Sequence, residues 1–129
     1  MATWQELVGF VKSNYQIHLE EDEHLSLNFN TTGLRTQMIH LFMEEDSLGN
    51  EWMTIGSAIG AVGQGELEPV LKLANQKICG GLVIVDDLVV VRHCVPLENA
   101  DPDEVTLPIG FVANIADELE KIYSGTDNF

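Results

Sequence analysis

Three neighbouring residues, Arg92, His93 and Cys94, are the side chains in this sequence best suited to chemistry. A cysteine thiolate beside a histidine can act as a nucleophile, and both residue types bind zinc. They end an apolar run that reads as a strand, in which successive side chains point to opposite faces. His93 and Cys94 should therefore point apart, so a dyad or a zinc site needs a further residue from elsewhere. We expect a strand-end histidine and a small buried cysteine.

Two acidic clusters and one glycine-rich stretch are the remaining candidates for ligand binding. The acids at 20–23 and 44–46 lack the spacing of calcium loops, and we interpret them as a solvated rim that protects strand edges. The stretch GAVGQGELEP matches no nucleotide fingerprint, has no lysine, and places Glu66 and Glu68 where an anion would bind. No Ser/His/Asp motif or Cys-x-x-Cys is present. The sequence therefore predicts no catalytic residue, no metal and no cofactor.

The charge balance restricts the possible partners. With 21 acidic residues against 6 basic ones, the chain carries a net charge of −15. It should be repelled by nucleic acids and by anionic membranes, so we expect neither as a partner. The N-terminus does not read as a signal peptide, and the longest apolar run is far shorter than the roughly 20 residues that cross a bilayer. Only two cysteines are present, and we expect a cytoplasmic protein with reduced thiols.

The hydrophobic periodicity predicts one α+β domain over residues 1–129. Helices are expected over about 4–15 and 66–78, and a third helix should begin at the cap Asp101 and run to Gly125, kinked or restarted near Pro108. Strands are expected over about 25–30, 35–44, 51–61, 82–85 and 88–97. The expected order is helix, three strands, helix, two strands, helix, with an antiparallel five-stranded sheet.

Several of these strands are apolar on both faces, which is more hydrophobic surface than a small monomer usually leaves in water. Homodimerisation is the simplest way to cover it, and the alternative is that the three helices suffice. The predicted dimer interface consists of Leu67, Val70, Leu71, Ala74, Val89 and Val91. The predicted partner-binding face, which includes adaptable methionines, consists of Met38, Phe42, Met53 and Ile55.

The segment VVVRHCVPLENADPDEV, followed by FVANIADELEKIYSG, leads from a strand through an apolar-proline-leucine step into a capped helix. Together with the order of elements along the whole chain, it resembles the type III secretion chaperone-like fold and, within it, the YbjN-type domain proteins. The resemblance implies a compact protomer, commonly dimeric, that holds a partner polypeptide without catalysis. Secretion chaperones of this shape bind an extended stretch of their client, whereas YbjN-type relatives have no agreed biochemical activity.

The sequence therefore predicts a non-enzymatic, chaperone-like homodimer that binds a protein or peptide client through apolar strand and helix faces. A competing hypothesis is a small-ligand sensor or an enzyme whose polar pocket gathers His40, Arg92 and His93 across the sheet. A third is a structural subunit with a docking surface but no groove. Convergence of those three side chains in one concave pocket would favour the second hypothesis.

Overall fold

A computed structural model describes residues 3–31, 33–77 and 80–125 of the chain. The described elements, in chain order, are α1 (Trp4–Asn14), β1 (Gln16–Glu21), β2 (His24–Asn30), β3 (Thr36–Glu45), β4 (Glu51–Ala61), α2 (Leu67–Ala74), β5 (Gly81–Val85), β6 (Leu88–Pro96), the short 3-10 helix η1 (Leu97–Asn99) and α3 (Pro102–Tyr123). All strand pairs are antiparallel, and the six strands form one open sheet in the order β1-β2-β3-β4-β6-β5.

The prediction of a five-stranded sheet is wrong, because β1 precedes the first expected strand. Most of β1 is exposed, and only Ile17 packs against the core. A β-bulge shifts the register between Ile17 and Leu19, which disturbs the period of two that identifies a strand in a sequence. β1 is a strand because it pairs with β2 in a hairpin. The pattern of its own side chains does not predict this pairing.

The predicted helices are found with different ends. Thr3 caps α1 as its pattern predicts, since its hydroxyl accepts a hydrogen bond from the Glu6 amide at 3.2 Å. α2 ends at Ala74, and the predicted C-terminal residue of this helix, Ile78, lies outside the described residues. α3 is one continuous helix through Pro108, so of the two alternatives expected there, a kink or a fresh start, the fresh start is not found. Its flanking turns are held in the core by buried apolar side chains, and these compensate for the missing amide donor.

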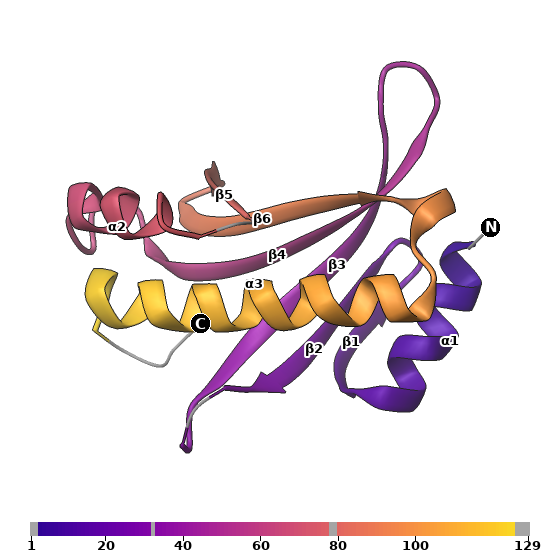
Figure 1. The fold of residues 1–129 in the computed structure, drawn as a ribbon, viewed down its shortest axis with the longest axis horizontal. Helices are drawn as coiled ribbons and strands as arrows, with labels where there is room; N and C mark the ends of the chain where they lie inside the picture. Colours follow the sequence, from indigo (N-terminus) through magenta and orange to yellow (C-terminus); the bar gives the residue numbers. More distant parts are fainter. Residues whose placement is uncertain (1–2, 32, 78–79, 126–129) are drawn as a thin grey trace.

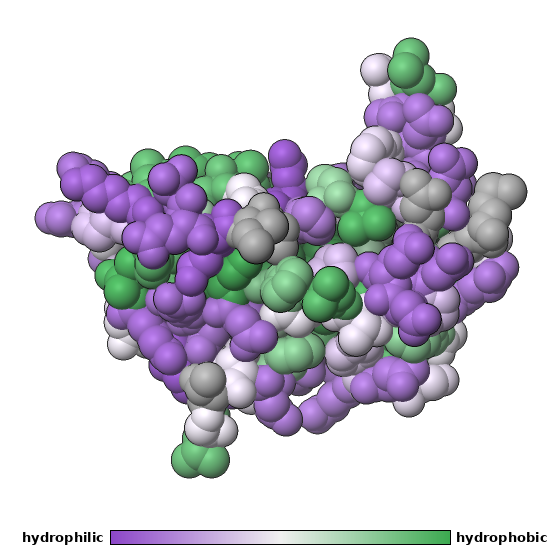
Figure 2. All heavy atoms as spheres, viewed as in Figure 1, coloured by the Kyte–Doolittle hydropathy of each residue, from purple (hydrophilic) through white to green (hydrophobic). Residues whose placement is uncertain are grey.

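α3 lies across one face of the sheet, and α1 and α2 flank its two ends (Figure 1). We call this the helix face, and the opposite side of the sheet the open face. The core lies between α3 and the helix face. It is formed chiefly by Leu27, Ile39, Leu41, Met53, Ile55 and Ile59 from the sheet and by Val105, Ile109, Val112, Ala116 and Leu119 from α3. Viewed from the same side, hydrophilic side chains cover most of the surface, and a smaller apolar area lies over the middle of α3 (Figure 2).

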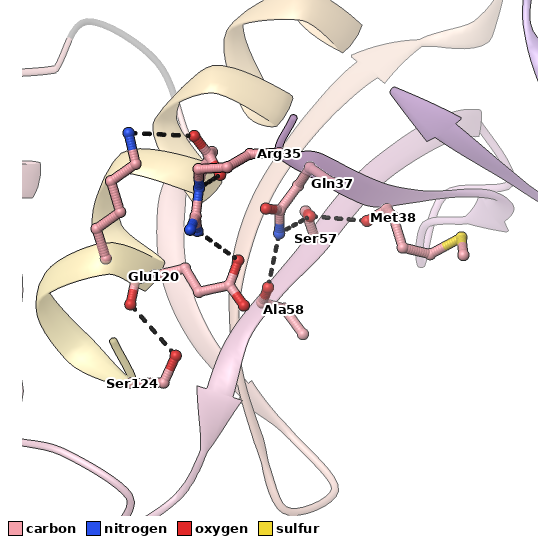
Figure 3. A network of polar contacts seen from close by, with 9 residues as sticks. Arg35, Gln37, Met38, Ser57, Ala58, Glu120 and Ser124 are labelled. Carbon is pink, nitrogen blue, oxygen red and sulfur yellow. Dashed lines mark hydrogen bonds and ion pairs between the residues drawn. The ribbon is translucent and has the colours of Figure 1, made fainter. Parts of the chain in front are cut away.

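A buried ionic cluster joins α3 to the start of β3 (Figure 3). Arg35 Nε donates to Asp117 Oδ1 at 2.7 Å, and Arg35 Nη2 lies 3.6 Å from Glu120 Oε1. The two carboxylate side chains are only 4% and 0% exposed. Buried carboxylates are costly without a charged partner, so this cluster favours one position of α3 over the sheet.

A second buried contact joins β3 to β4 in the same region (Figure 3). The Gln37 amide donates to the Ser57 hydroxyl and to the Ala58 carbonyl, both at 2.9 Å. The Ser57 hydroxyl in turn donates to the Met38 carbonyl at 2.7 Å. These bonds place polar side chains in a mainly apolar layer and thereby favour one register of the two strands.

The end of α3 packs closely on the turn that follows β4. The Tyr123 hydroxyl donates to the Ala61 carbonyl at 2.7 Å. A Cβ atom added to Gly65 would lie 1.9 Å from the Tyr123 carbonyl oxygen, a distance at which the backbone must move. The glycine-rich stretch at this turn thus serves the close approach of a helix end.

Gly65→Ala is expected to lower the free energy of unfolding by about 3 kcal/mol, because the added methyl overlaps backbone that cannot rotate away. Urea denaturation followed by circular dichroism measures the change. Gly9→Ala is the matched control, since nothing lies within 4 Å of its added Cβ on α1, and it should not destabilise the protein. A Gly65→Ala variant as stable as wild type would contradict this packing.

Arg35→Met is expected to lower the free energy of unfolding by about 3 kcal/mol, because it removes the guanidinium that faces two buried carboxylates. The same denaturation experiment measures it. Lys72→Met is the control: its ion pair with Glu68 is largely exposed, so the free energy should change little. Equal effects of the two substitutions would show that the buried cluster does not stabilise the fold.

Candidate functional site: a groove on the open face

The open face carries a groove of about 450 Å³ that crosses β2, β3, β4 and β6. Among the described residues, no helix packs over this face (Figure 1). One half of the groove is mainly apolar and is lined by Ala58, Val85, Leu88 and Val90, with Asp86 from the turn between β5 and β6 among them. The other half is polar and is lined by His24, His40, Glu44, Thr54 and Arg92, with Phe42 among them. The groove therefore offers an apolar surface beside hydrogen-bonding and charged groups.

Strand register decides which side chains meet in the groove. His40 pairs with Gly56 and Gly56 pairs with Arg92, so His40 and Arg92 share the open face. His93 is paired with the core residue Ile55 and lies on the helix face. Of the three residues expected in a polar pocket, the structure thus brings two together and separates the third.

His24 is a groove residue that sequence reasoning considered only as a possible partner of His93 or Cys94 and did not include in the predicted pocket. Its Nε2 lies 3.1 Å from Nδ1 of His40, and its ring stacks on Phe42 with centroids 4.2 Å apart and an interplanar angle of 13°. One ring of such a pair must accept the hydrogen bond, so at least one histidine is neutral. The pairing of β2 with β3 creates this contact, and no sequence spacing signals it.

Burial lowers the pKa of His40 from its usual 6.5, and the nearby charges of His24 and His18 lower it further. The groove therefore holds a histidine that resists protonation in the folded chain. A neutral imidazole can donate or accept a hydrogen bond to a bound group without adding charge.

Cys94 lies on the open face, as the alternation of side chains predicts, but it is exposed and not buried. Its sulfur is 3.5 Å from the Thr54 hydroxyl oxygen, and this hydroxyl donates a short hydrogen bond to the Glu44 carboxylate. A hydroxyl is not a general base, so within the described ranges the thiol lacks an activating partner. Cys79 lies outside the described residues.

Two of the four predicted partner-binding residues are not accessible. Met53 and Ile55 are 0% exposed beneath α3. The register pairs Met53 with Met43 and Ile55 with Leu41, so both belong to the helix face and not to the face of Met38. Met38 and Phe42 do lie on the open face, where Phe42 lines the groove and is 37% exposed. Their contact with a partner stays a prediction.

The predicted dimer interface is likewise divided by the fold. Val70, Val89 and Val91 are buried in the core of the chain itself, because β6 turns Val89 and Val91 toward the helix face and α2 packs through Val70. Leu67 and Leu71 on α2 are exposed, and Ala74 is half-buried. Only the α2 part of the predicted interface remains available to a second protomer.

No group of three or more His, Cys, Asp or Glu side chains in the described part of the chain could hold a metal ion. None of the described helices combines the length and the apolar composition that crossing a membrane requires. No family model and no curated protein matches the chain. The case for function therefore depends on the geometry of the groove.

The low pKa of His40 predicts a pH dependence of stability. The unfolded chain, with a histidine pKa near 6.5, binds more protons than the folded chain, so the free energy of unfolding falls as the pH drops below about 6.5. His40→Gln should make this fall smaller. Urea denaturation of both proteins at pH 7.5 and pH 5.5 measures the difference, and identical pH dependence would contradict the assignment.

Proposed function

We propose that the protein is a non-enzymatic, chaperone-like binding protein of the cytoplasm that holds an extended segment of a client polypeptide in the open-face groove. The observation that carries the proposal is a groove of about 450 Å³, half of it apolar, on a sheet face without helix cover among the described residues. An apolar area of this kind on a small domain is typical of an interaction site.

The open face, in the groove and beside it, suits bound side chains of variable shape; Phe42 lines the groove, and Met38 lies on the same face outside its lining. Met38 is a flexible thioether and Phe42 a broad ring, and both lie on the open face of β3. An extended segment presents alternate side chains to such a surface, so small residues such as Ala58 leave recesses between larger ones. The groove would thus select an apolar pattern more than one defined sequence.

The homodimer belongs to the same proposal, with a changed interface. β5 is an edge strand, and its outward backbone groups have no partner among the described residues. Ile84 on β5 and Leu71 on α2 are 59% and 53% exposed. The opposite edge, β1, carries the acids Glu20 and Glu21, which discourage pairing. We therefore infer that two protomers meet through β5 and α2.

Ile84→Lys is expected to convert the dimer into a monomer, because it puts a charge on an apolar edge strand. Light scattering at high micromolar concentration measures the mass. Leu19→Lys on the edge strand β1, a comparably exposed position, is the control and should leave the dimer intact. A wild-type protein that is strictly monomeric under these conditions would contradict the dimer.

A second candidate function is a small-ligand sensor, because the same groove brings His24, His40 and Arg92 to one face. Pockets for small ligands span roughly 300–1,000 Å³, and this groove falls within that range. The two functions differ in what fills the apolar half: several side chains of a peptide or a single compact molecule.

Phe42→Asp tests the client-binding role. Random twelve-residue peptides displayed on phage are selected against the wild-type protein, and the enriched peptides are labelled and titrated against variants. Phe42→Asp should weaken binding by about tenfold or more, because it places a charge in the groove.

Phe111→Asp is the matched control, since Phe111 is 44% exposed on α3, away from the groove, and its substitution should leave binding unchanged. Failure to enrich any peptide, or equal binding by wild type and Phe42→Asp, would argue against the client-binding role.

A further inference from the structure

Arg92 is the one basic side chain in the described part of the chain without an acidic partner. All six basic residues lie in that part, and each of the other five has a carboxylate oxygen at 2.6–3.6 Å. Those five are Lys12, Arg35, Lys72, Lys77 and Lys121. In a chain with 21 acidic residues, partners for a cation are abundant. Arg92 nevertheless projects unpaired and exposed into the groove.

The residues on either side of Arg92 leave space around it. Its cross-strand neighbours are Gly56 on β4 and Gly81 on β5. Neither glycine has a positive φ. An added Cβ would meet only ordinary contacts, at 3.4 Å from a Val90 methyl carbon for Gly56 and 4.0 Å from the Arg92 carbonyl oxygen for Gly81. The fold therefore does not require glycine at either position.

Glycine weakens a strand, and inside a strand it often marks a place where a ligand or another backbone approaches closely. The register thus flanks Arg92 with two positions that carry no side chain, and of these two glycines Gly56 lines the groove. We call this strip, formed by Gly56, Arg92 and Gly81, the slot. Two glycines that the backbone does not need, beside the one unpaired cation of the described chain, indicate a recognition site for an anion.

The chemistry of the slot favours a single carboxylate. A planar guanidinium binds a carboxylate through two parallel hydrogen bonds. A polyanion would be repelled by the net charge of −15, and Glu44 and Asp86 line the same groove. One negative charge is thus accommodated at Arg92, whereas several are not.

Val90 continues the apolar half of the groove two residues before Arg92 on the same strand face. An extended peptide repeats its side chains on one face at roughly 6.6 Å, the same interval that separates two such positions on β6. A client segment that lies over the open face, parallel to β6, could therefore place an acidic side chain at Arg92 and an apolar side chain near Val90.

We propose that the groove recognises client segments by one Asp or Glu side chain, whose carboxylate binds Arg92 between Gly56 and Gly81 while the neighbouring apolar side chains lie on Ala58 and Val90. This inference rests on the proposed client-binding function and names the chemistry of the client. Arg92 acts as the anchor that sets the register of an otherwise adaptable segment.

Phage selection of random twelve-residue peptides against wild type and variants tests the anchor. Wild-type protein should enrich peptides with one acidic residue next to apolar residues, and Arg92→Gln should lose the acidic preference. Arg92→Glu should enrich Lys or Arg at that position. Lys72→Gln, which removes an equal charge on α2, is the control and should keep the wild-type preference.

Titration of an enriched peptide measures the strength of the anchor. Replacing its acidic residue by the corresponding amide should weaken binding to wild type by about tenfold or more and leave binding to Arg92→Gln unchanged. Gly56→Ala should weaken binding by a similar factor without lowering the unfolding temperature, because its methyl enters the slot without a clash.

The outcomes distinguish a failure of the proposed anchor from a failure of the proposed client-binding function. Enriched peptides that depend on Phe42 but show no acidic preference would overturn the anchor and leave client binding standing. The anchor would also be overturned if peptides amidated at the C-terminus, with a free N-terminus, lost all binding, since the terminal carboxylate would then be the bound group. Selection that enriches no peptide would overturn both proposals.

Discussion

The apolar stripe of α3 is buried against one face of the sheet, and the remaining architecture depends on this contact. Val105, Ile109, Val112, Ala116 and Leu119 are fully enclosed there. The helix is long enough to cross β3, β4 and β6, so one element covers the centre of the sheet (Figure 1). Because α1 and α2 pack beside its ends, the described helices all serve the same face. The other face is thereby left without helix cover among the described residues.

Buried polar groups define where α3 lies on the sheet, which the apolar stripe by itself does not define. An apolar stripe alone tolerates small shifts along the sheet, whereas buried carboxylates require their partners at defined distances. The ionic contacts of Asp117 and Glu120 with Arg35, and the hydroxyl of Tyr123 on the Ala61 carbonyl, fix the C-terminal half of α3 at two points. A fixed α3 in turn holds β3 and β4, the strands that carry most of the groove.

The open face carries both polar and apolar side chains, and so it differs from a sheet face that is apolar throughout. Histidines, Thr54 and Glu44 occupy one part, and small aliphatic residues occupy the other. The aromatic stack of His24 on Phe42 and the hydrogen bond from Thr54 to Glu44 satisfy these groups within the chain. Arg92 is different, because its charge is not satisfied within the described chain. That contrast makes it the informative residue of the groove.

The sequence by itself determined the local features whose cause lies within a few residues. The capping of α1 by Thr3, the positions of the three helices and five of the six strands, and the opposite directions of His93 and Cys94 all follow from periodicity and cap chemistry. The sequence did not predict β1, because β1 is a strand through its pairing with β2 and not through the pattern of its own side chains.

Only the tertiary structure decided which faces of different strands coincide. Alternation shows that Met38 and Phe42 share a face and that Met53 and Ile55 share one, but it does not show that these faces are opposite. The pairing of Phe42 with Thr54 settles this, and the same register places Arg92 between Gly56 and Gly81 and His24 beside His40. Register arises from contacts between distant segments, so the core, the groove and the position of Arg92 all depend on the tertiary structure.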